Sequence, residues 1–236
     1  MTAKELFSNI KGKGSPKIKL LGDSITHGVG GSGFKQDGEP IVEEFKRNPN
    51  GYCWAKRFSE LMAERYGASV INNACTGTTI EFVIKHFDTL VAPSDDLVIC
   101  TIGTNNRHQY MKTGEKRTRE DMSDAFYSNI LLLDSKFRAA GVPVIFVANI
   151  PATTQNEKDG ADYWRILHMK DIAELYKLAG VECGFALVSL YDAMNEYLRR
   201  VGKKLEEFLP DGLHPNNAGY DVMLQLLLDA FGEPKA

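Results

Sequence analysis

Short apolar runs alternate along this sequence with longer segments of helical periodicity. The apolar runs predict strands at residues 17–21, 69–72, 96–102, 142–149 and 187–189. Apolar residues at helical spacing predict helices at residues 54–66, 122–140, 163–178 and about 218–231. This alternation is typical of a parallel sheet whose two faces are covered by helices. We therefore expect an α/β fold around a central parallel sheet of about five strands.

Length and composition are those of one soluble domain. The chain has 236 residues, of which 43% are hydrophobic and 25% charged, and neither an internal repeat nor a shift in composition divides it. We therefore expect a single domain over residues 1–236. The 28 basic residues nearly balance the 31 acidic ones, so nothing indicates nucleic acid as a partner. The sequence does not indicate an oligomeric state.

Targeting and metal-binding signals are absent from the sequence. No apolar stretch approaches the roughly 20 residues of a membrane span, and the N-terminal residues lack the apolar core of a secretory signal. The expected location is the cytoplasm, although a secreted form with its signal removed would look the same. The cysteines lack the close pairs of zinc sites, so we expect free thiols and no metal or cofactor. They are Cys53, Cys75, Cys100 and Cys183.

A serine follows the first predicted strand, within Gly22-Asp23-Ser24. Gly22 allows a sharp turn there, and the next residues can open a helix whose free N–H groups favour an anion. A serine hydroxyl at this point can act as a nucleophile once a base removes its proton. The alternative interpretation is that Ser24 or Asp23 simply caps the helix.

Near the other end, Asp211 precedes His214 by three residues. At this spacing the carboxylate can hold the imidazole Nδ1–H, which leaves Nε2 free to act as a base. A polar turn would explain Asp211 and Gly212, but it gives no reason for His214. With Ser24, these residues form a predicted Ser-His-Asp triad: Ser24 is the nucleophile, His214 the base and Asp211 the group that orients it.

Acyl transfer also needs hydrogen-bond donors for an oxyanion. Gly77 follows the second predicted strand and Asn105 follows the third. Because the carboxyl ends of parallel strands share one edge of the sheet, we expect a backbone N–H near Gly77 and the Asn105 amide to face the same crevice as Ser24.

Four blocks of the sequence together resemble the SGNH (GDSL-type) hydrolase family. The blocks occur in the family's order, and they are residues 22–24, Gly77, residues 103–105 and residues 211–215. The resemblance implies a flavodoxin-like three-layer α/β/α sandwich and no cofactor. It implies Ser24 as nucleophile, His214 as base and Asp211 as its orienting group. It also implies an oxyanion hole formed by the N–H groups of Ser24 and Gly77 and by the Asn105 side chain.

Two positions depart from that family's pattern. Asn106 stands where the third block often carries an aspartate, which puts in doubt any hydrogen bond that the carboxylate would make. Ala74 stands where the second block usually has a glycine. Neither change removes a predicted catalytic group.

Other polar residues near the strand ends are weaker candidates. We expect Asp23, His108 and Asn149 to be substrate contacts, because each follows a predicted strand on the crevice side. His27 could compete as the base, but a helix beginning at residue 25 would turn its ring away from Ser24. The irregular segment 29–50 is Gly-rich at its start and long for a connection, so it either lines the site or is mobile.

The predicted function is that of a serine esterase or acylhydrolase acting on a small-molecule carboxylic ester. The polar character of residues 29–50 favours a short acyl or acetyl group, and a carbohydrate is one candidate for the alcohol that carries it. An acyltransferase, a lysophospholipase or a thioesterase would use the same triad. A metal-dependent phosphoesterase and a non-catalytic carbohydrate- or lipid-binding protein are the rivals from other classes.

Overall fold

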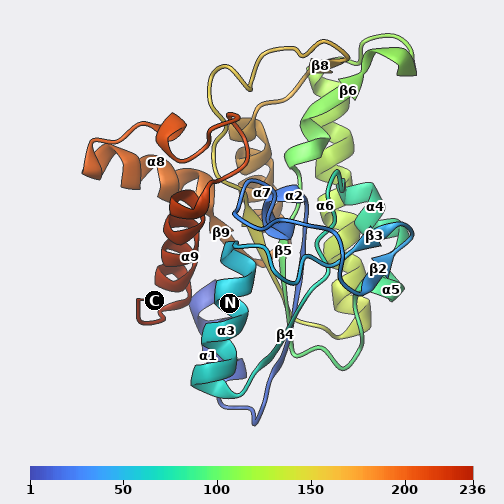
Figure 1. Cartoon of the computed structure of the whole chain (residues 1–236). Coiled ribbons are helices and arrows are strands. Elements are labelled where there is room, and N and C mark those ends of the chain that lie inside the picture. The colour runs from blue at the N-terminus through green and yellow to red at the C-terminus, as the bar shows by residue number, and fades with distance from the viewer. Residues whose placement is uncertain (236) are drawn as a thin grey trace.

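The middle of the molecule is a five-stranded parallel sheet in the order β4-β1-β5-β7-β9. Its strands are β1 (Lys17–Gly22), β4 (Ser69–Asn72), β5 (Leu97–Thr101), β7 (Val144–Ala148) and β9 (Ala186–Ser189). The computed structural model describes residues 1–235 (Figure 1). This strand order is that of flavodoxin-like folds, so the predicted α/β class, sheet and strand number are confirmed.

Helices cover both faces of the sheet (Figure 1). One face carries α1 (Ala3–Lys11), α3 (Trp54–Tyr66), α8 (Leu190–Val201) and α9 (Asn217–Phe231). The other carries α4 (Ile80–Lys85), α5 (Phe87–Leu90), α6 (Arg119–Ala140) and α7 (Met169–Cys183). Across residues 1–235, no helix combines the length and apolarity that crossing a membrane requires.

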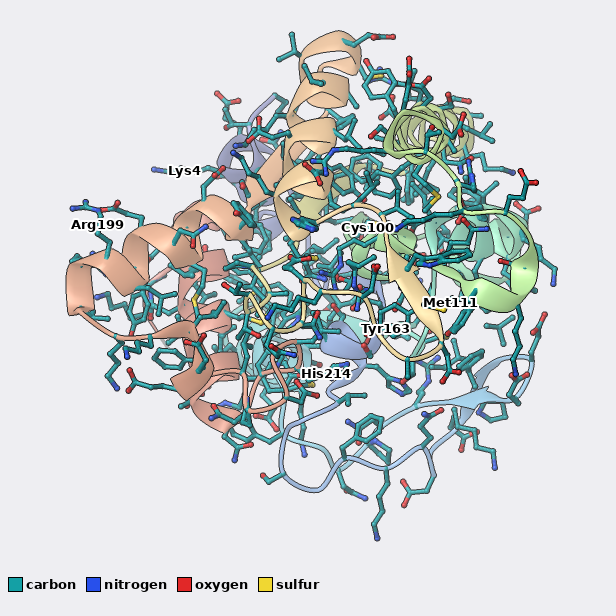
Figure 2. All side chains as sticks on the ribbon, turned by 90° about the horizontal axis from the view of Figure 1, so that it is seen from above. Lys4, Cys100, Met111, Tyr163, Arg199 and His214 are labelled. Carbon is teal, nitrogen blue, oxygen red and sulfur yellow. The ribbon has the colours of Figure 1, made fainter. Side chains whose placement is uncertain are left out.

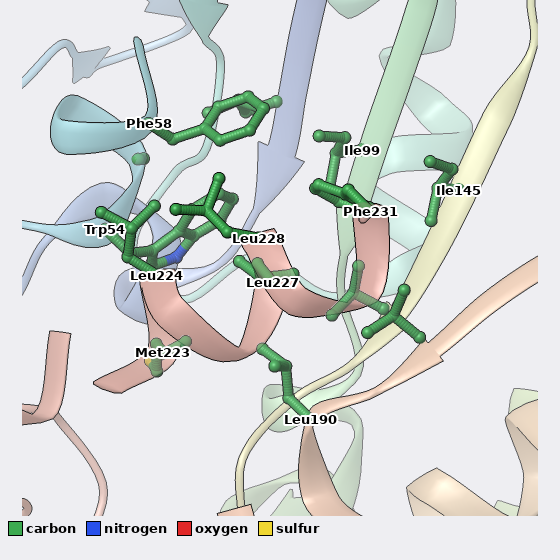
Figure 3. Close-up of a cluster of buried hydrophobic side chains, with 14 of the residues drawn as sticks. Trp54, Phe58, Ile99, Ile145, Leu190, Met223, Leu224, Leu227, Leu228 and Phe231 are labelled. Carbon is green, nitrogen blue, oxygen red and sulfur yellow. The ribbon is translucent and has the colours of Figure 1, made fainter. Parts of the chain in front are cut away.

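The central strands supply side chains to two separate cores, because successive side chains point to opposite faces. In β5, Leu97 and Ile99 pack on the α9 side, whereas Val98 and Cys100 pack on the α6 side. Figure 3 shows the first core, in which Ile99 and Ile145 of the sheet face apolar residues of α9, with Phe231 next to Ile99. Both faces of the inner strands β1, β5 and β7 are therefore buried beyond Lys17, which explains why these strands read as nearly continuous apolar runs.

One predicted helix begins too early. The segment Tyr163–Arg165 is strand β8, which pairs antiparallel with β6 (His108–Tyr110). Helix α7 starts only at Met169, behind the cap residue His168, and it continues to Cys183 before Gly184 ends it in the left-handed conformation. Aromatic residues at the start of the segment suit a strand as well as a helix. The antiparallel pairing with β6 determines that this segment is a strand and not a helix.

The two stretches predicted to be irregular contain short ordered elements. Residues 29–50 include the hairpin of β2 (Pro40–Val42) and β3 (Phe45–Lys46). The stretch after β5 contains the 3₁₀ helices η1 (Thr104–Arg107) and η2 (Met111–Thr113), with β6 between them. The remaining elements are α2 (Ser24–His27) directly after β1, and η3 (Leu205–Glu207) before the last helix. The β6–β8 pair lies above the carboxyl ends of the sheet strands (Figure 1).

Candidate active site

Ser24 and Asn105 follow two adjacent strands at the point where the chain reverses its direction across the sheet. The chain passes from β1 to β4 on one side and then crosses to β5 on the other. In open α/β sheets the crevice at this switch point is the usual place for a ligand. Ser24 begins α2 directly after β1, and Asn105 lies in η1 after β5.

The turn that presents Ser24 depends on close packing at Gly22. A Cβ at this position would overlap Thr101 Oγ1 and would lie 2.6 Å from Thr26 Oγ1. Those two hydroxyl groups are hydrogen-bonded to each other, so α2 is held directly against β5. Asp23 caps α2, because its Oδ1 accepts a hydrogen bond of 3.0 Å from the N–H of Ile25.

The structure brings Ser24, His214 and Asp211 together. Ser24 Oγ lies 2.8 Å from His214 Nε2, although the two residues are 190 positions apart. His214 Nδ1 lies 2.6 Å from Asp211 Oδ2. Because a carboxylate only accepts, this contact assigns the ring proton to Nδ1 and leaves Nε2 to accept from the serine hydroxyl. The predicted convergence of the two ends of the chain is therefore present.

Local hydrogen bonds fix the Asp211 carboxylate. Its Oδ1 accepts from the backbone N–H of His214 at 2.7 Å and of Leu213 at 2.9 Å. Partial burial acts to raise the pKa of Asp211, but the hydrogen bonds from His214 and Leu213 outweigh burial and lower it. The carboxylate is thus ionised at neutral pH, as required of a group that orients an imidazole.

Helix α9 ties the Ser24 helix to the His214 loop. The buried Tyr220 hydroxyl lies 2.9 Å from the carbonyl oxygen of Ile25, within α2, and 2.7 Å from that of Val29, just after α2. Gly30 packs against the loop itself, since a Cβ there would lie 2.6 Å from the carbonyl oxygen of Pro215. The start of segment 29–50 therefore supports the site. This role of Tyr220 was not predicted from the sequence. Its position only six residues after His214 is the one sequence feature that places it near the site.

The three predicted oxyanion donors have free hydrogens. Asn105 Nδ2 donates to the carbonyl oxygen of Thr78 at 2.9 Å, which uses one of its two hydrogens and orients the other. Gly77 has a φ of +78° and faces open space, with no atom within 4 Å of the position of a Cβ. Within residues 1–235, the backbone N–H groups of Ser24 and Gly77 have no protein acceptor.

Asp23 and Asn149 do not line the crevice, so their predicted role as substrate contacts is wrong. Asp23 is 0% exposed and Asn149 1% exposed. Asn149 Nδ2 lies 3.3 Å from Asp23 Oδ2 and 3.1 Å from Thr104 Oγ1. Burial raises the pKa of Asp23, against the opposing effect of its hydrogen bond with Thr104. The three side chains form a buried polar network beneath Ser24 and Asn105.

The His27 ring forms its hydrogen bonds with structural groups and not with Ser24 Oγ. Its Nδ1 lies 3.0 Å from Thr76 Oγ1, and its Nε2 lies 2.9 Å from the carbonyl oxygen of Lys46. The ring is 1% exposed, and burial lowers its pKa, opposed by the hydrogen bond to Lys46. His27 thus joins α2 to the loop after β4 and to the β2–β3 hairpin, as expected for a ring that points away from the nucleophile.

We expect the free energy of unfolding to fall as the pH drops below about 6.5, the value for histidine in an unfolded chain. The folded protein keeps His27 neutral to lower pH, so the unfolded state binds more protons in this range. The slope for each such histidine has an upper bound of about 1.4 kcal/mol per pH unit, the value for one whole proton. Urea titrations from pH 7 to pH 5 should show a smaller slope for His27→Gln than for the exposed control His168→Gln. Parallel slopes would contradict this assignment.

Asn106 departs from the family pattern, yet its side-chain amide makes hydrogen bonds through both its oxygen and its nitrogen. Its Oδ1 accepts from the N–H of Ile80 at 3.0 Å, and its Nδ2 donates to Glu81 Oε2 at 2.8 Å. The other Glu81 oxygen accepts from Asn129 Nδ2 at 2.9 Å. The carboxylate of this network thus belongs to Glu81, and an amide at position 106 is its complement.

Asn106→Asp should therefore destabilise the protein by about 1–3 kcal/mol, because it removes a donor and sets two carboxylates against each other. Glu81→Gln in the same chain should recover most of that loss, since the new amide can donate to Asp. Urea unfolding of both single variants and the double variant gives the coupling energy. Strictly additive losses would show that residues 81 and 106 do not interact.

Two cavities open near these elements, and neither includes Ser24 or His214 in its lining. The larger, of about 570 Å³, lies between the β2–β3 hairpin, α3 and the edge strand β4. The other, of about 350 Å³, includes Asn105 and His108. We call it the β6 groove, and it borders the candidate site through Asn105. In the view from above (Figure 2), His214 and Tyr163 both lie toward the middle of the molecule, whereas Arg199 lies at its rim.

A parallel α/β sandwich with a serine, a histidine and an aspartate joined at its switch point has the arrangement of serine-dependent hydrolases. The chain belongs to the GDSL-like lipase/acylhydrolase family, whose model matches residues 20–222. A search of curated proteins finds none that matches the sequence significantly.

Several solved structures share the fold over nearly the whole chain. LAE5, an α/β hydrolase from the metagenome of Lake Arreo in Spain, is 21% identical, with a TM-score of 0.70 over 94% of this chain and 98% of its own. Axe2, an acetylxylan esterase from Geobacillus stearothermophilus, is 20% identical, with a TM-score of 0.69 over 94% and 97%. A lipase/acylhydrolase from Enterococcus faecalis is 20% identical, with a TM-score of 0.64 over 92% and 96%.

Proposed function

We propose that this protein hydrolyses carboxylic esters through an acyl-enzyme on Ser24. The observation that carries the proposal is the chain of two contacts, 2.8 Å from Ser24 Oγ to His214 Nε2 and 2.6 Å from His214 Nδ1 to Asp211 Oδ2. An arrangement of this kind raises the nucleophilicity of a serine hydroxyl. Membership of an acylhydrolase family supports the same chemistry.

The reaction divides into two steps. His214 Nε2 takes the proton of Ser24 as Oγ attacks the ester carbonyl carbon. The negative oxygen of the tetrahedral intermediate accepts hydrogen bonds from the N–H groups of Ser24 and Gly77 and from Asn105 Nδ2. The intermediate collapses, and the alcohol leaves with the proton from His214. Water, deprotonated by the same ring, then attacks the acyl-enzyme and releases the acid.

The proposed substrate carries a short acyl group, such as acetate, on a carbohydrate or another small alcohol. Axe2, which shares the fold, is an acetyl-xylooligosaccharide esterase, and segment 29–50 is rich in charged residues. Transfer of the acyl group to an alcohol, or hydrolysis of a thioester or lysophospholipid, would use the same three residues. This chemistry requires no cofactor.

Covalent labelling tests the nucleophile. A p-nitrophenyl phosphonate should inactivate the protein with a mass increase on the peptide that contains Ser24, and EDTA should not alter the rate. Ser24→Ala is the matched control and should take up no label. Phosphonate-resistant hydrolysis of a p-nitrophenyl phosphate ester that EDTA abolishes would favour the metal-dependent phosphoesterase class instead. Equal hydrolysis by the native protein and Ser24→Ala would reject the proposal, and no hydrolysis by either would favour a binding protein.

A further inference from the structure

The β6 groove is lined in part by Asn105, one of the proposed oxyanion donors. Its volume is about 350 Å³, and Asn105, His108, Tyr110 and Met122 are among its lining residues. In the β6–β8 ladder, His108 lies opposite Arg165 and Tyr110 lies opposite Tyr163. Side chains two residues apart on a strand share a face, so these four side chains form one cluster on one face of the ladder.

Arg165 determines which nitrogen of His108 carries the proton. Its Nη1 lies 3.3 Å from His108 Nδ1. A guanidinium group can only donate hydrogen bonds, so Nδ1 must accept and the single ring proton lies on Nε2. Burial, and then the positive charges of Arg165 and Arg107, lower the pKa of His108 to about 4. His108 is therefore a neutral ring with an Nε2–H donor at neutral pH.

Arg165 is itself held in place by Tyr163. Its Nη2 donates to the Tyr163 hydroxyl at 3.1 Å, and its guanidinium carbon lies 4.6 Å from the centre of the Tyr163 ring. The His108 ring also packs against Tyr163, with 5.2 Å between ring centres. This packing limits the rotation of both side chains, so the His108 donor is preorganised.

His108 Nε2 is open to a ligand. Within residues 1–235 it has no hydrogen-bond partner, and it is not among the buried polar atoms that lack one. Tyr110, beside it in the groove, is 57% exposed and meets the His108 ring edge-on at 5.2 Å. An exposed aromatic ring next to a fixed donor suits a ligand with an apolar C–H face and hydroxyl groups at its edge.

We propose that His108 determines specificity for the alcohol half of the substrate. In this assignment the hydroxylated ring of a carbohydrate ester occupies the β6 groove against Tyr110, and an oxygen of that ring accepts the His108 Nε2–H. Arg165 is a positioning residue, because it acts on the substrate through the tautomer of His108. The assignment rests on the proposed function, in which Asn105 binds the ester oxygen at the mouth of the same groove.

Variants of His108 test the donor with two acetyl esters. The first is an acetylated methyl β-xyloside, whose alcohol can accept hydrogen bonds, and the second is p-nitrophenyl acetate. His108→Phe should raise KM for the xyloside ester about tenfold, as expected for a lost hydrogen bond in a partly dry groove, and raise KM for p-nitrophenyl acetate far less. His108→Gln should recover most of the difference, because its amide nitrogen reaches the place of Nε2, and His108→Asn should not. The exposed His168→Phe is the matched control.

The ratio of the two KM values decides the outcome. Equal changes for both esters, or no change for either, would overturn the assignment while leaving Ser24-dependent hydrolysis intact. A direct readout is independent of turnover. In NMR titrations, methyl β-xyloside should bind more weakly to the double variant Ser24→Ala/His108→Phe than to the single variant Ser24→Ala. Equal binding by both proteins would reject the groove as the carbohydrate site even if the proposed hydrolysis fails.

Arg165→Met tests the positioning role. The ¹⁵N spectrum of His108 in the native protein should show a protonated Nε2 and an unprotonated Nδ1, and Arg165→Met should shift both resonances toward a mixture of tautomers. The KM for the xyloside ester should rise in the same variant. An unchanged ¹⁵N pattern would show that Arg165 does not set the tautomer of His108.

Discussion

Replacing Ser24 or His214 by alanine is expected to lower kcat for p-nitrophenyl acetate by at least about 10⁴-fold. Either change removes the 2.8 Å contact through which the serine would lose its proton. Residues that act as one unit give non-additive losses. The kcat of the double variant should therefore be about equal to that of the slower single variant. Steady-state kinetics of the three variants, with rates corrected for uncatalysed hydrolysis, measure this directly.

The control for these variants is their stability. Ser24 is small and His214 lies at a loop, so urea unfolding midpoints should remain close to that of the native protein. Losses that multiply in the double variant would mean that Ser24 and His214 act independently. That result would contradict the triad even if each single variant were slow.

Gly22→Ala should combine a large loss of stability with a loss of rate. The added methyl group would overlap Thr101 Oγ1 and would lie 2.7 Å from Thr26 Cβ, at a point where α2 is packed against β5. Overpacking of this kind costs about 1–3 kcal/mol, or roughly 2–12 °C in Tm for a domain of this size. Because relief requires α2 to move, Ser24 should shift from His214, and a displacement of about 1 Å can cost about 10²-fold in kcat.

Gly12→Ala is the matched control for this experiment. Gly12 has a φ of −74°, and no atom lies within 4 Å of the position of its Cβ. Thermal unfolding and p-nitrophenyl acetate kinetics should therefore be unchanged for Gly12→Ala. Equal small effects at both positions would show that the space around Gly22 is not restricted.

Local sequence signals predicted most of the fold. They were wrong where strand pairing with a segment far away in the sequence determines the secondary structure. The inner strands β1, β5 and β7 were evident because both of their faces are buried. The segment beginning at Tyr163 was predicted to be helical, yet its aromatic residues pair with β6, more than 50 positions earlier. A short apolar run does not by itself distinguish a strand from a buried helix.

The same limit applies to the candidate site. The blocks around Ser24 and His214 were recognisable because each needs a particular turn. Burial was not readable: Asp23 and Asn149 follow strands just as Asn105 does, yet both lie beneath the crevice. The contact of Asn106 with Glu81 joins residues 25 positions apart and explains an amide that looked anomalous in the sequence.

The sequence by itself determined the alternation of strands and helices, the turn at Gly22 and the short Asp211–His214 loop, because periodicity, glycine and carboxylate spacing act over a few residues. Only the tertiary structure decided that Ser24 Oγ meets His214 Nε2, that His27 is engaged by Thr76, and that His108 carries its proton on Nε2. Each of these outcomes depends on which distant groups compete for the same hydrogen bond, and that competition is settled only when the sheet and its helices pack.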